Sequence, residues 1–252
     1  MNLYLVDDGA HVAVPALLRQ AGIAGISIPV DETTIASTLR DALDQYDTAR
    51  LALVSVRLTL DIQVAEMPVW LHDVLTVLAR RATVIELHLS SSSQHDAPSS
   101  PRGDGRAVEL IKQVLERTRP HGLAVSLSHR CGDWLERIDD AVRLAMRLNR
   151  SILGLTFNLA HWRRIDGRNL DASLHLAAPR MVLLTLGTDD VGLNDAKSAL
   201  QTCARLGYRG PVGLEVADSA VSAATLRWVV GRLGSAPASP ARGAVTPPTG
   251  SP

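Results

Sequence analysis

Short apolar runs alternate with amphipathic stretches from Leu3 to about Leu233. Eight of the runs are rich in Leu, Val and Ile, which is typical of parallel strands buried on both faces. We predict these strands at residues 3–6, 24–29, 51–57, 83–89, 123–128, 152–157, 181–186 and 211–216. The stretches between them carry apolar residues at helical spacing, for example Ile35, Leu39, Ala42, Leu43 and Tyr46. This alternation predicts strand–helix units that build one parallel sheet.

Eight units in 252 residues fit a single domain, because (β/α)8 barrels use about 250 residues. We therefore predict an α/β protein with one TIM barrel over residues 1–234. Residues 235–252 are rich in Ala, Pro and Ser, and this composition predicts a disordered tail. Residues 90–105 are polar and rich in Ser, Pro and Gly, and they follow the fourth strand. Barrels place active-site loops there, so we interpret this segment as a mobile lid or a disordered insertion.

Charge and composition narrow the range of partners. The chain has 26 basic and 26 acidic residues, so no basic surface for nucleic acid is expected. No apolar run reaches the roughly 18 residues that span a bilayer, and the first residues lack the pattern of a secretory signal. Cys131 and Cys203 are the only cysteines, and we expect both to be reduced. We expect a cytoplasmic protein that binds neither nucleic acid nor a membrane.

Strand parity indicates which side chains enter the barrel, because successive side chains alternate between the lumen and the helix layer. In the eighth strand Val212, Leu214 and Val216 suit the helix layer, which turns Glu215 inward. The same alternation turns a set of further residues inward: Ser55, Arg57, Glu86, His88, Ser126, Ser128, Gly154, Thr156, Asn158, Thr185 and Gly213. Polar residues near the carboxyl ends of barrel strands converge on one site, where barrel enzymes carry out their chemistry.

Glu215 is the strongest catalytic candidate, since a carboxylate inside a barrel must be paired, metal-bound or functional. The alternative is a structural ion pair with Arg57 or a histidine. His161 follows the sixth strand, where an imidazole can bind substrate or relay a proton, or is merely solvated. Glu86 is the third catalytic candidate, but a shift of one residue would turn it beneath the helices. His129 follows the fifth strand and is either a ligand or a solvated loop residue.

Three stretches resemble the xylose-isomerase-like sugar phosphate isomerase/epimerase superfamily. Residues 206–216 (LGYRGPVGLEV) resemble its closing motif, a Gly-Tyr-x-Gly turn into the eighth strand that ends in glutamate. Residues 155–162 (LTFNLAHW) resemble its sixth-strand motif, which is usually Asp-x-x-His. Residues 17–28 (LLRQAGIAGISI) are similar to its early helix, Gly-x-x-Gly and strand. Together with the eight-unit alternation, the likeness covers roughly residues 10–230.

The resemblance implies a divalent metal, Mn²⁺, Mg²⁺ or Zn²⁺, held by glutamate, aspartate, histidine and glutamate from strands five to eight. The corresponding residues in this chain are Ser128, Asn158, Thr185 and Glu215. Only Glu215 is the same residue type as in the family. The neutral side chains at the other three positions attract a cation much less strongly than carboxylates and an imidazole do. A tight site of the family type is therefore not expected. A weaker site remains a hypothesis, built from His129, His161 and Glu215 with help from Glu86 and His88.

The resemblance also implies an isomerase or epimerase that acts on a sugar, sugar phosphate or polyol, with Glu215 and a histidine exchanging a proton next to a carbonyl. The residues expected to contact substrate are Arg57, His88, Ser128, His129, Asn158 and Thr185. Arg57 would anchor a phosphate or carboxylate. The alternative is a barrel without catalytic activity that serves as a small-molecule binder or partner subunit. The neutral charge disfavours a third function, abasic-site endonuclease. Related barrels often pair through surface helices, so a homodimer is also expected.

Overall fold

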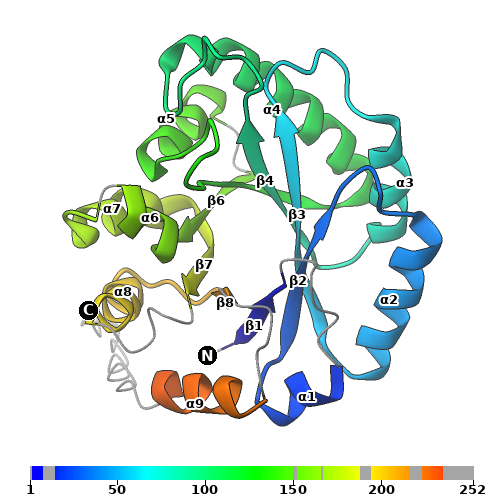
Figure 1. Ribbon diagram of the computed structural model, residues 1–252, viewed down its shortest axis with the longest axis vertical. Helices are drawn as coiled ribbons and strands as arrows, with labels where there is room; N and C mark the ends of the chain where they lie inside the picture. Colours follow the sequence, from blue (N-terminus) through cyan, green and yellow to red (C-terminus); the bar gives the residue numbers. More distant parts are fainter. Residues whose placement is uncertain are drawn as a thin grey trace, which may run out of the picture.

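The strands of the computed structural model form a closed parallel barrel in sequence order (Figure 1). The model describes residues 2–7, 15–149, 152–165, 167–187, 194–215 and 223–234. The strands are β1 (Leu3–Val6), β2 (Gly25–Val30), β3 (Ala52–Asp61), β4 (Val84–Ser90), β5 (Ala124–Ser128), β6 (Leu153–Asn158), β7 (Met181–Gly187) and β8 (Val212–Glu215). Pairing of β1 with β8 closes the ring, and this confirms the predicted (β/α)8 barrel.

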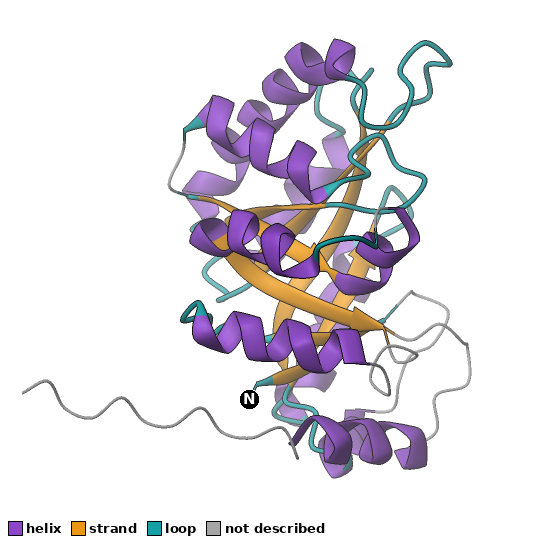
Figure 2. Ribbon diagram, turned by 90° about the vertical axis from the view of Figure 1, so that its left-hand side faces the viewer, coloured by secondary structure: helices purple, strands orange, loops and turns teal. Residues whose placement is uncertain are grey.

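Helices surround this ring and cover its outer face (Figures 1 and 2). They are α1 (Pro15–Gln20), α2 (Ala36–Thr48), α3 (Val69–Leu78), α4 (Asp104–Thr118), α5 (Ile138–Leu148), α6 (Leu159–Ile165), α7 (Leu170–Ala177), α8 (Asn194–Arg205) and α9 (Ala223–Gly234). Short 3-10 turns lie at Pro101–Gly103, Arg119–His121 and Ala178–Arg180. Within the described ranges, no helix combines the length and the apolar character that crossing a membrane requires.

The predicted strand positions agree closely with the observed ones. Every strand begins within one residue of its predicted start, while β3 continues to Asp61, four residues past its predicted end at 57. The extension arises because β3 keeps pairing with β4 up to Asp61 and Ser90. The apolar stripe of α2 buries Leu39, Leu43 and Tyr46, but Ile35 precedes the helix and is 64% exposed. The predicted tail at 235–252 lies outside the described residues, as does Val216.

The barrel has apolar packing on both sides of its strands. Most of the core lies between strands and helices, where Leu5 and Leu214 take the outward positions. A smaller cluster of Tyr4, Val6, Val54 and Leu183 occupies inward positions. Gly213 makes room for this cluster, because a Cβ atom there would lie 2.6 Å from Cζ of Tyr4. The Tyr4 ring therefore occupies space that a side chain at position 213 of β8 would otherwise occupy.

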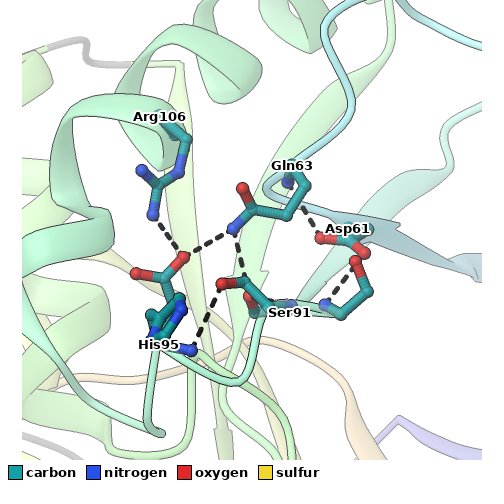
Figure 3. A network of polar contacts seen from close by, with 8 residues as sticks. Asp61, Gln63, Ser91, His95 and Arg106 are labelled. Atoms are coloured by element: carbon teal, nitrogen blue, oxygen red, sulfur yellow. Dashed lines mark hydrogen bonds and ion pairs between the residues drawn. The ribbon is translucent and has the colours of Figure 1, made fainter.

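The segment between β4 and α4 is a folded loop held to β3 by a polar network (Figure 3). Asp61 accepts hydrogen bonds from the backbone N–H groups of Gln63 and Ser92, at 2.8 and 2.9 Å. The Gln63 side chain donates to Ser91 and to the buried Asp96, which also pairs with Arg106 of α4. The interpretation of residues 90–105 as a disordered insertion is therefore wrong, and the interpretation as a mobile lid stays a prediction.

Replacing Gly213 with alanine is expected to destabilise the barrel by about 1–3 kcal/mol, because the new methyl group would overlap the Tyr4 ring. Urea unfolding at equilibrium measures this change. Gly105→Ala is the matched control, since a Cβ atom at this position of α4 meets no atom within 4 Å. The control is expected to leave stability unchanged or slightly raised. Equal effects of the two substitutions would contradict the packing of Tyr4 against Gly213.

Candidate functional site

Polar side chains from several strands meet inside the barrel, as strand parity predicts. The Ser55 hydroxyl of β3 donates to the Glu86 carboxylate of β4. Ser126 of β5 and Thr156 of β6 share a hydrogen bond of 2.8 Å. Near the carboxyl end of the ring, Asn158 of β6 donates to Glu215 of β8. These contacts cross between strands inside the ring, so they confirm the predicted inward direction of the residues that make them.

Glu86 lies deep in the lumen and is only 3% exposed. The hydroxyl groups of Ser55 and Ser27 donate to its Oε1 atom. Burial raises the pKa of Glu86, although the Ser55 hydrogen bond and the charge of Arg57 oppose that rise. Parity also predicts an inward Ser27 on β2, but the sequence analysis did not select it. The environment holds the Glu86 carboxyl beneath the mouth of the barrel, and its catalytic role remains a prediction.

Asn158 links Glu215 to the start of α6. Its Nδ2 atom donates to Oε2 of Glu215 at 2.8 Å, and its Oδ1 atom accepts from the backbone N–H of His161 at 3.1 Å. The two contacts fix the orientation of the amide, because only the nitrogen can donate and only the oxygen can accept. Asn158 therefore presents a neutral donor to the carboxylate from the position where the resemblance expects a metal-binding aspartate.

His161 faces the other oxygen of Glu215. Its Nε2 atom lies 3.7 Å from Oε1, while Nδ1 accepts from the backbone N–H of Cys131 at 3.4 Å. Because Nδ1 accepts this hydrogen bond, the ring N–H lies on Nε2 and is directed toward the carboxylate. Burial raises the pKa of Glu215, but contact with His161 and the Asn158 hydrogen bond outweigh burial and lower it to about 2. The Glu215 side chain is 28% exposed, so this ionised group is accessible from solvent.

Arg57 and His88 lie on the β3–β4 side of the same interior. The Nε and Nη2 atoms of Arg57 are buried and have no hydrogen-bond partner, and the same holds for both ring nitrogens of His88. Asp133 is the nearest acid to His88, with Oδ2 3.8 Å from Nδ1, which is too far for a hydrogen bond. Sequence patterns do not indicate Asp133 or the exposed Arg130, because both belong to the loop after β5 and no strand parity applies there.

Ser128 and Thr185 occupy the inward positions expected for substrate contacts, and each is 2% exposed. Their hydroxyl groups belong to β5 and β7, on either side of β6 and Asn158. Contact with a substrate remains a prediction for both residues.

His129 turns toward Phe157 and the helix layer. It is fully buried, and its ring packs edge-on against Phe157, whose side chain faces the helix layer, with ring centroids 5.6 Å apart. Its Nε2 atom accepts from the backbone N–H of Asn158 at 3.1 Å. Burial, followed by the charge of His161, lowers the pKa of His129 to about 3. These contacts hold the ring between β5, β6 and α6 and contradict the alternative of a solvated loop residue, while a role of His129 as a ligand stays a prediction.

The donor atoms at the mouth do not fit the metal set that the resemblance implies. Among the described residues, no group of three or more His, Cys, Asp and Glu side chains is arranged to hold a metal ion. Glu215 is the only carboxylate at the four corresponding positions, and Asn158 directs its amide nitrogen, not its oxygen, toward that carboxylate. An N–H group cannot coordinate a cation, so this arrangement satisfies Glu215 by hydrogen bonding.

Neither a protein-family model nor a curated protein matches the chain, whereas solved structures do. The apo 3-keto-D-glucoside 4-epimerase from E. coli has a TM-score of 0.70 and 14% identity, covering 92% of this chain and 99% of that one. D-Psicose 3-epimerase from Clostridium cellulolyticum H10, with D-tagatose, has a TM-score of 0.70 and 13% identity, covering 85% of this chain and 84% of that one.

A third structure carries a metal. This xylose isomerase-like TIM barrel protein from Mycobacterium smegmatis, in complex with magnesium, has a TM-score of 0.64 and 16% identity, covering 88% of this chain and 87% of that one. At such identities the likeness shows the fold alone. The chain has the fold of the xylose-isomerase-like TIM barrels, which include sugar epimerases and isomerases, and the suspected resemblance is confirmed at that level.

Replacing His129 with glutamine is expected to flatten the pH dependence of stability. The folded-state pKa of about 3 lies below the ordinary 6.5, so the unfolded chain takes up the proton first as pH falls. The wild type therefore loses up to about 1.4 kcal/mol per pH unit from this group between those values. Glutamine keeps an acceptor for the Asn158 N–H and does not titrate. Denaturant unfolding between pH 4 and 7 measures the slope, with His72→Gln at an exposed histidine as the control.

Asn158→Asp is expected to place a second carboxylate against Glu215 and to lower stability by roughly 1–3 kcal/mol without metal. Added Mn²⁺ or Mg²⁺ should restore part of that loss, since two carboxylates and His161 offer a cation better donors. Thermal unfolding with chelator and with each ion measures both effects. The wild type is expected to show no midpoint shift with either ion, and a clear upward shift would contradict the hydrogen-bonded description of Glu215.

Proposed function

We propose that the chain is an isomerase or epimerase that transfers a proton next to the carbonyl group of a sugar-like substrate. The observation that carries this proposal is the pair formed by Glu215 and His161 near the carboxyl ends of β6 and β8. The pair unites an ionised carboxylate with solvent access and a directed imidazole N–H. Barrel enzymes place their catalytic residues at this end, and sugar epimerases are among the structures that share the fold.

The pair can divide the work of proton transfer. The Glu215 carboxylate would remove the proton from the carbon beside the carbonyl group, so that the C–H electrons form a C=C bond. The carbonyl π electrons then move to oxygen and give an enediolate, which the Nε2–H of His161 stabilises by a hydrogen bond. Return of the proton from Glu215 to the neighbouring carbon on the same face completes isomerisation, whereas delivery of a proton from solvent water to the opposite face completes epimerisation, and neither route involves net oxidation. Asn158 orients the carboxylate throughout.

The low pKa of Glu215 has two consequences for this role. The carboxylate is ionised over the whole physiological range, so the base is always in its active form. The same low pKa makes it a weak base, which limits the rate unless substrate binding displaces one of its donors. The 3.7 Å separation between Nε2 of His161 and Oε1 leaves that imidazole proton free to move to a substrate oxygen.

A second function, non-catalytic binding of a small molecule, is favoured by the Asn158 hydrogen bond. That bond satisfies Oε2 of Glu215 in the absence of any ligand, as a structural carboxylate requires. In such a protein the mouth of the barrel would recognise a polyhydroxylated ligand without transferring a proton. Measurement of hydrogen exchange in a bound ligand separates the two functions.

Glu215→Gln is expected to lower proton exchange at least about 100-fold, because glutamine cannot accept the proton. Proton NMR in D₂O follows deuterium entering D-tagatose, D-allulose, their phosphates and hexuronates, with and without Mn²⁺. Glu109→Gln, at an exposed glutamate of α4, is the control and should exchange like the wild type. Saturable binding of one of these ligands to the wild type without deuterium entry would contradict proton transfer and support the binding function.

A further inference from the structure

Arg57 is the one described residue at the mouth that brings a guanidinium group inside the ring of strands with buried donors left unused. Its Nε and Nη2 atoms lie on one edge of the group, and neither has a hydrogen-bond partner. Burying such donors without an acceptor is unfavourable by roughly 1–3 kcal/mol or more. A ligand that supplies two acceptor atoms to this edge removes the penalty, so the arrangement favours an oxyanion.

The nearest carboxyl group does not fulfil that role. Glu86 stands beside Arg57 in the register of β3 and β4, yet its hydrogen bonds come from Ser55 and Ser27. Burial raises the pKa of Glu86, which favours its neutral form and weakens it as a counter-ion. The other charges that act on Arg57 are those of Glu215, Arg130 and Asp7, and none of these has a hydrogen bond to its buried Nε and Nη2 donors.

His88 adds a neutral donor and acceptor next to Arg57. It lies two residues beyond Glu86 on β4 and therefore on the same inward side, one step closer to the mouth. Burial and the charges of Arg57 and Arg130 lower the pKa of His88 to about 3, so the ring is neutral. One of its free nitrogens donates and the other accepts, which is the pattern that a hydroxyl group satisfies.

We propose that the ligand of this site is a polyhydroxy carboxylate, a sugar acid, whose carboxylate binds side-on to Nε and Nη2 of Arg57 and whose adjacent hydroxyl binds His88. This inference rests on the proposed function, since it names the substrate class of the same site. A planar carboxylate matches the edge of the guanidinium group in a bidentate contact. This edge offers two unused N–H donors, which the two oxygens of one carboxylate fill, whereas a phosphate would leave a terminal oxygen without a donor from this edge.

The geometry also places the rest of such a ligand near the proton-transfer pair. Arg57 and His88 belong to β3 and β4, while Glu215 ends β8 and His161 follows β6, across the ring (Figure 1). Arg57, His88 and Glu215 take inward positions of one closed ring, and His161 contacts Glu215, so the two groups share one interior. A short-chain acid can therefore hold its carboxylate at Arg57 while a carbon further along the chain meets Glu215.

Three probes with the same six-carbon polyol chain test the inference: D-gluconate, D-glucitol and D-glucitol 6-phosphate. Calorimetric titration of the full chain is expected to show gluconate binding at least tenfold more tightly than either of the others. Arg57→Gln is expected to remove that preference. Arg227→Gln, at an exposed arginine of α9, is the matched control and should retain it. Equal binding of the three probes, no binding of gluconate at millimolar concentration, or tighter binding of the phosphate would overturn the proposal.

The stability of Arg57→Gln gives a second measurement. If the guanidinium group serves a ligand, its removal leaves the thermal midpoint of the ligand-free protein unchanged or raised, because two buried N–H donors without acceptors are lost. A fall of several degrees would instead indicate a structural ion pair and overturn the proposal. Deuterium exchange in D₂O tests proton transfer separately. If the protein prefers gluconate but no hexuronate takes up deuterium, the sugar-acid ligand is retained and proton transfer is rejected.

Discussion

Closing a ring of parallel strands forces alternate side chains of every strand into one shared interior, where water cannot freely compensate charge. In this chain the charged or acidic side chains of Arg57, Glu86 and Glu215 enter that interior from β3, β4 and β8. Each is stabilised differently. Serine hydroxyl groups and a raised pKa accommodate Glu86, while an amide and an imidazole hold Glu215 ionised. The Nε and Nη2 donors of Arg57 have no protein acceptor. The chemistry of the mouth follows from these differences.

Asn158 decides how the carboxylate of Glu215 is stabilised. Its oxygen accepts from the backbone of His161 at the start of α6, which leaves only its nitrogen for Glu215. The residue therefore couples the geometry of a helix start to the charge of a side chain two strands away. An aspartate at this place would bring a second negative charge and would require a cation. Contact with His161 and the hydrogen bond from this neutral amide together lower the pKa of Glu215.

The sequence was sufficient to predict the ring of strands, because buried parallel strands are continuous apolar runs whose ends are easy to find. Strand parity was sufficient to predict that Glu215, Asn158 and Glu86 point inward, because a side chain at an inward position of a closed barrel must enter the lumen. It was not sufficient for His129, which follows β5 and turns toward Phe157 and the helix layer. Nor did composition show that the loop after β4 is folded, because Asp61, Gln63, Asp96 and Arg106 form its network across long sequence separations.

The loop residues Arg130 and Asp133 illustrate a further limit of sequence patterns. A loop has no period, so nothing in the residues after β5 indicates that their charges reach His88 and Arg57. Their positions matter because an anionic ligand or an enediolate requires positive charge nearby. In metal-dependent sites a divalent ion supplies that charge. Here Arg57 and Arg130 carry the positive charge, and a guanidinium group does so independently of metal supply and at every physiological pH. An acidic ligand would supply the acceptors that the buried Nε and Nη2 donors of Arg57 lack, which is the physical basis of the proposed sugar-acid ligand.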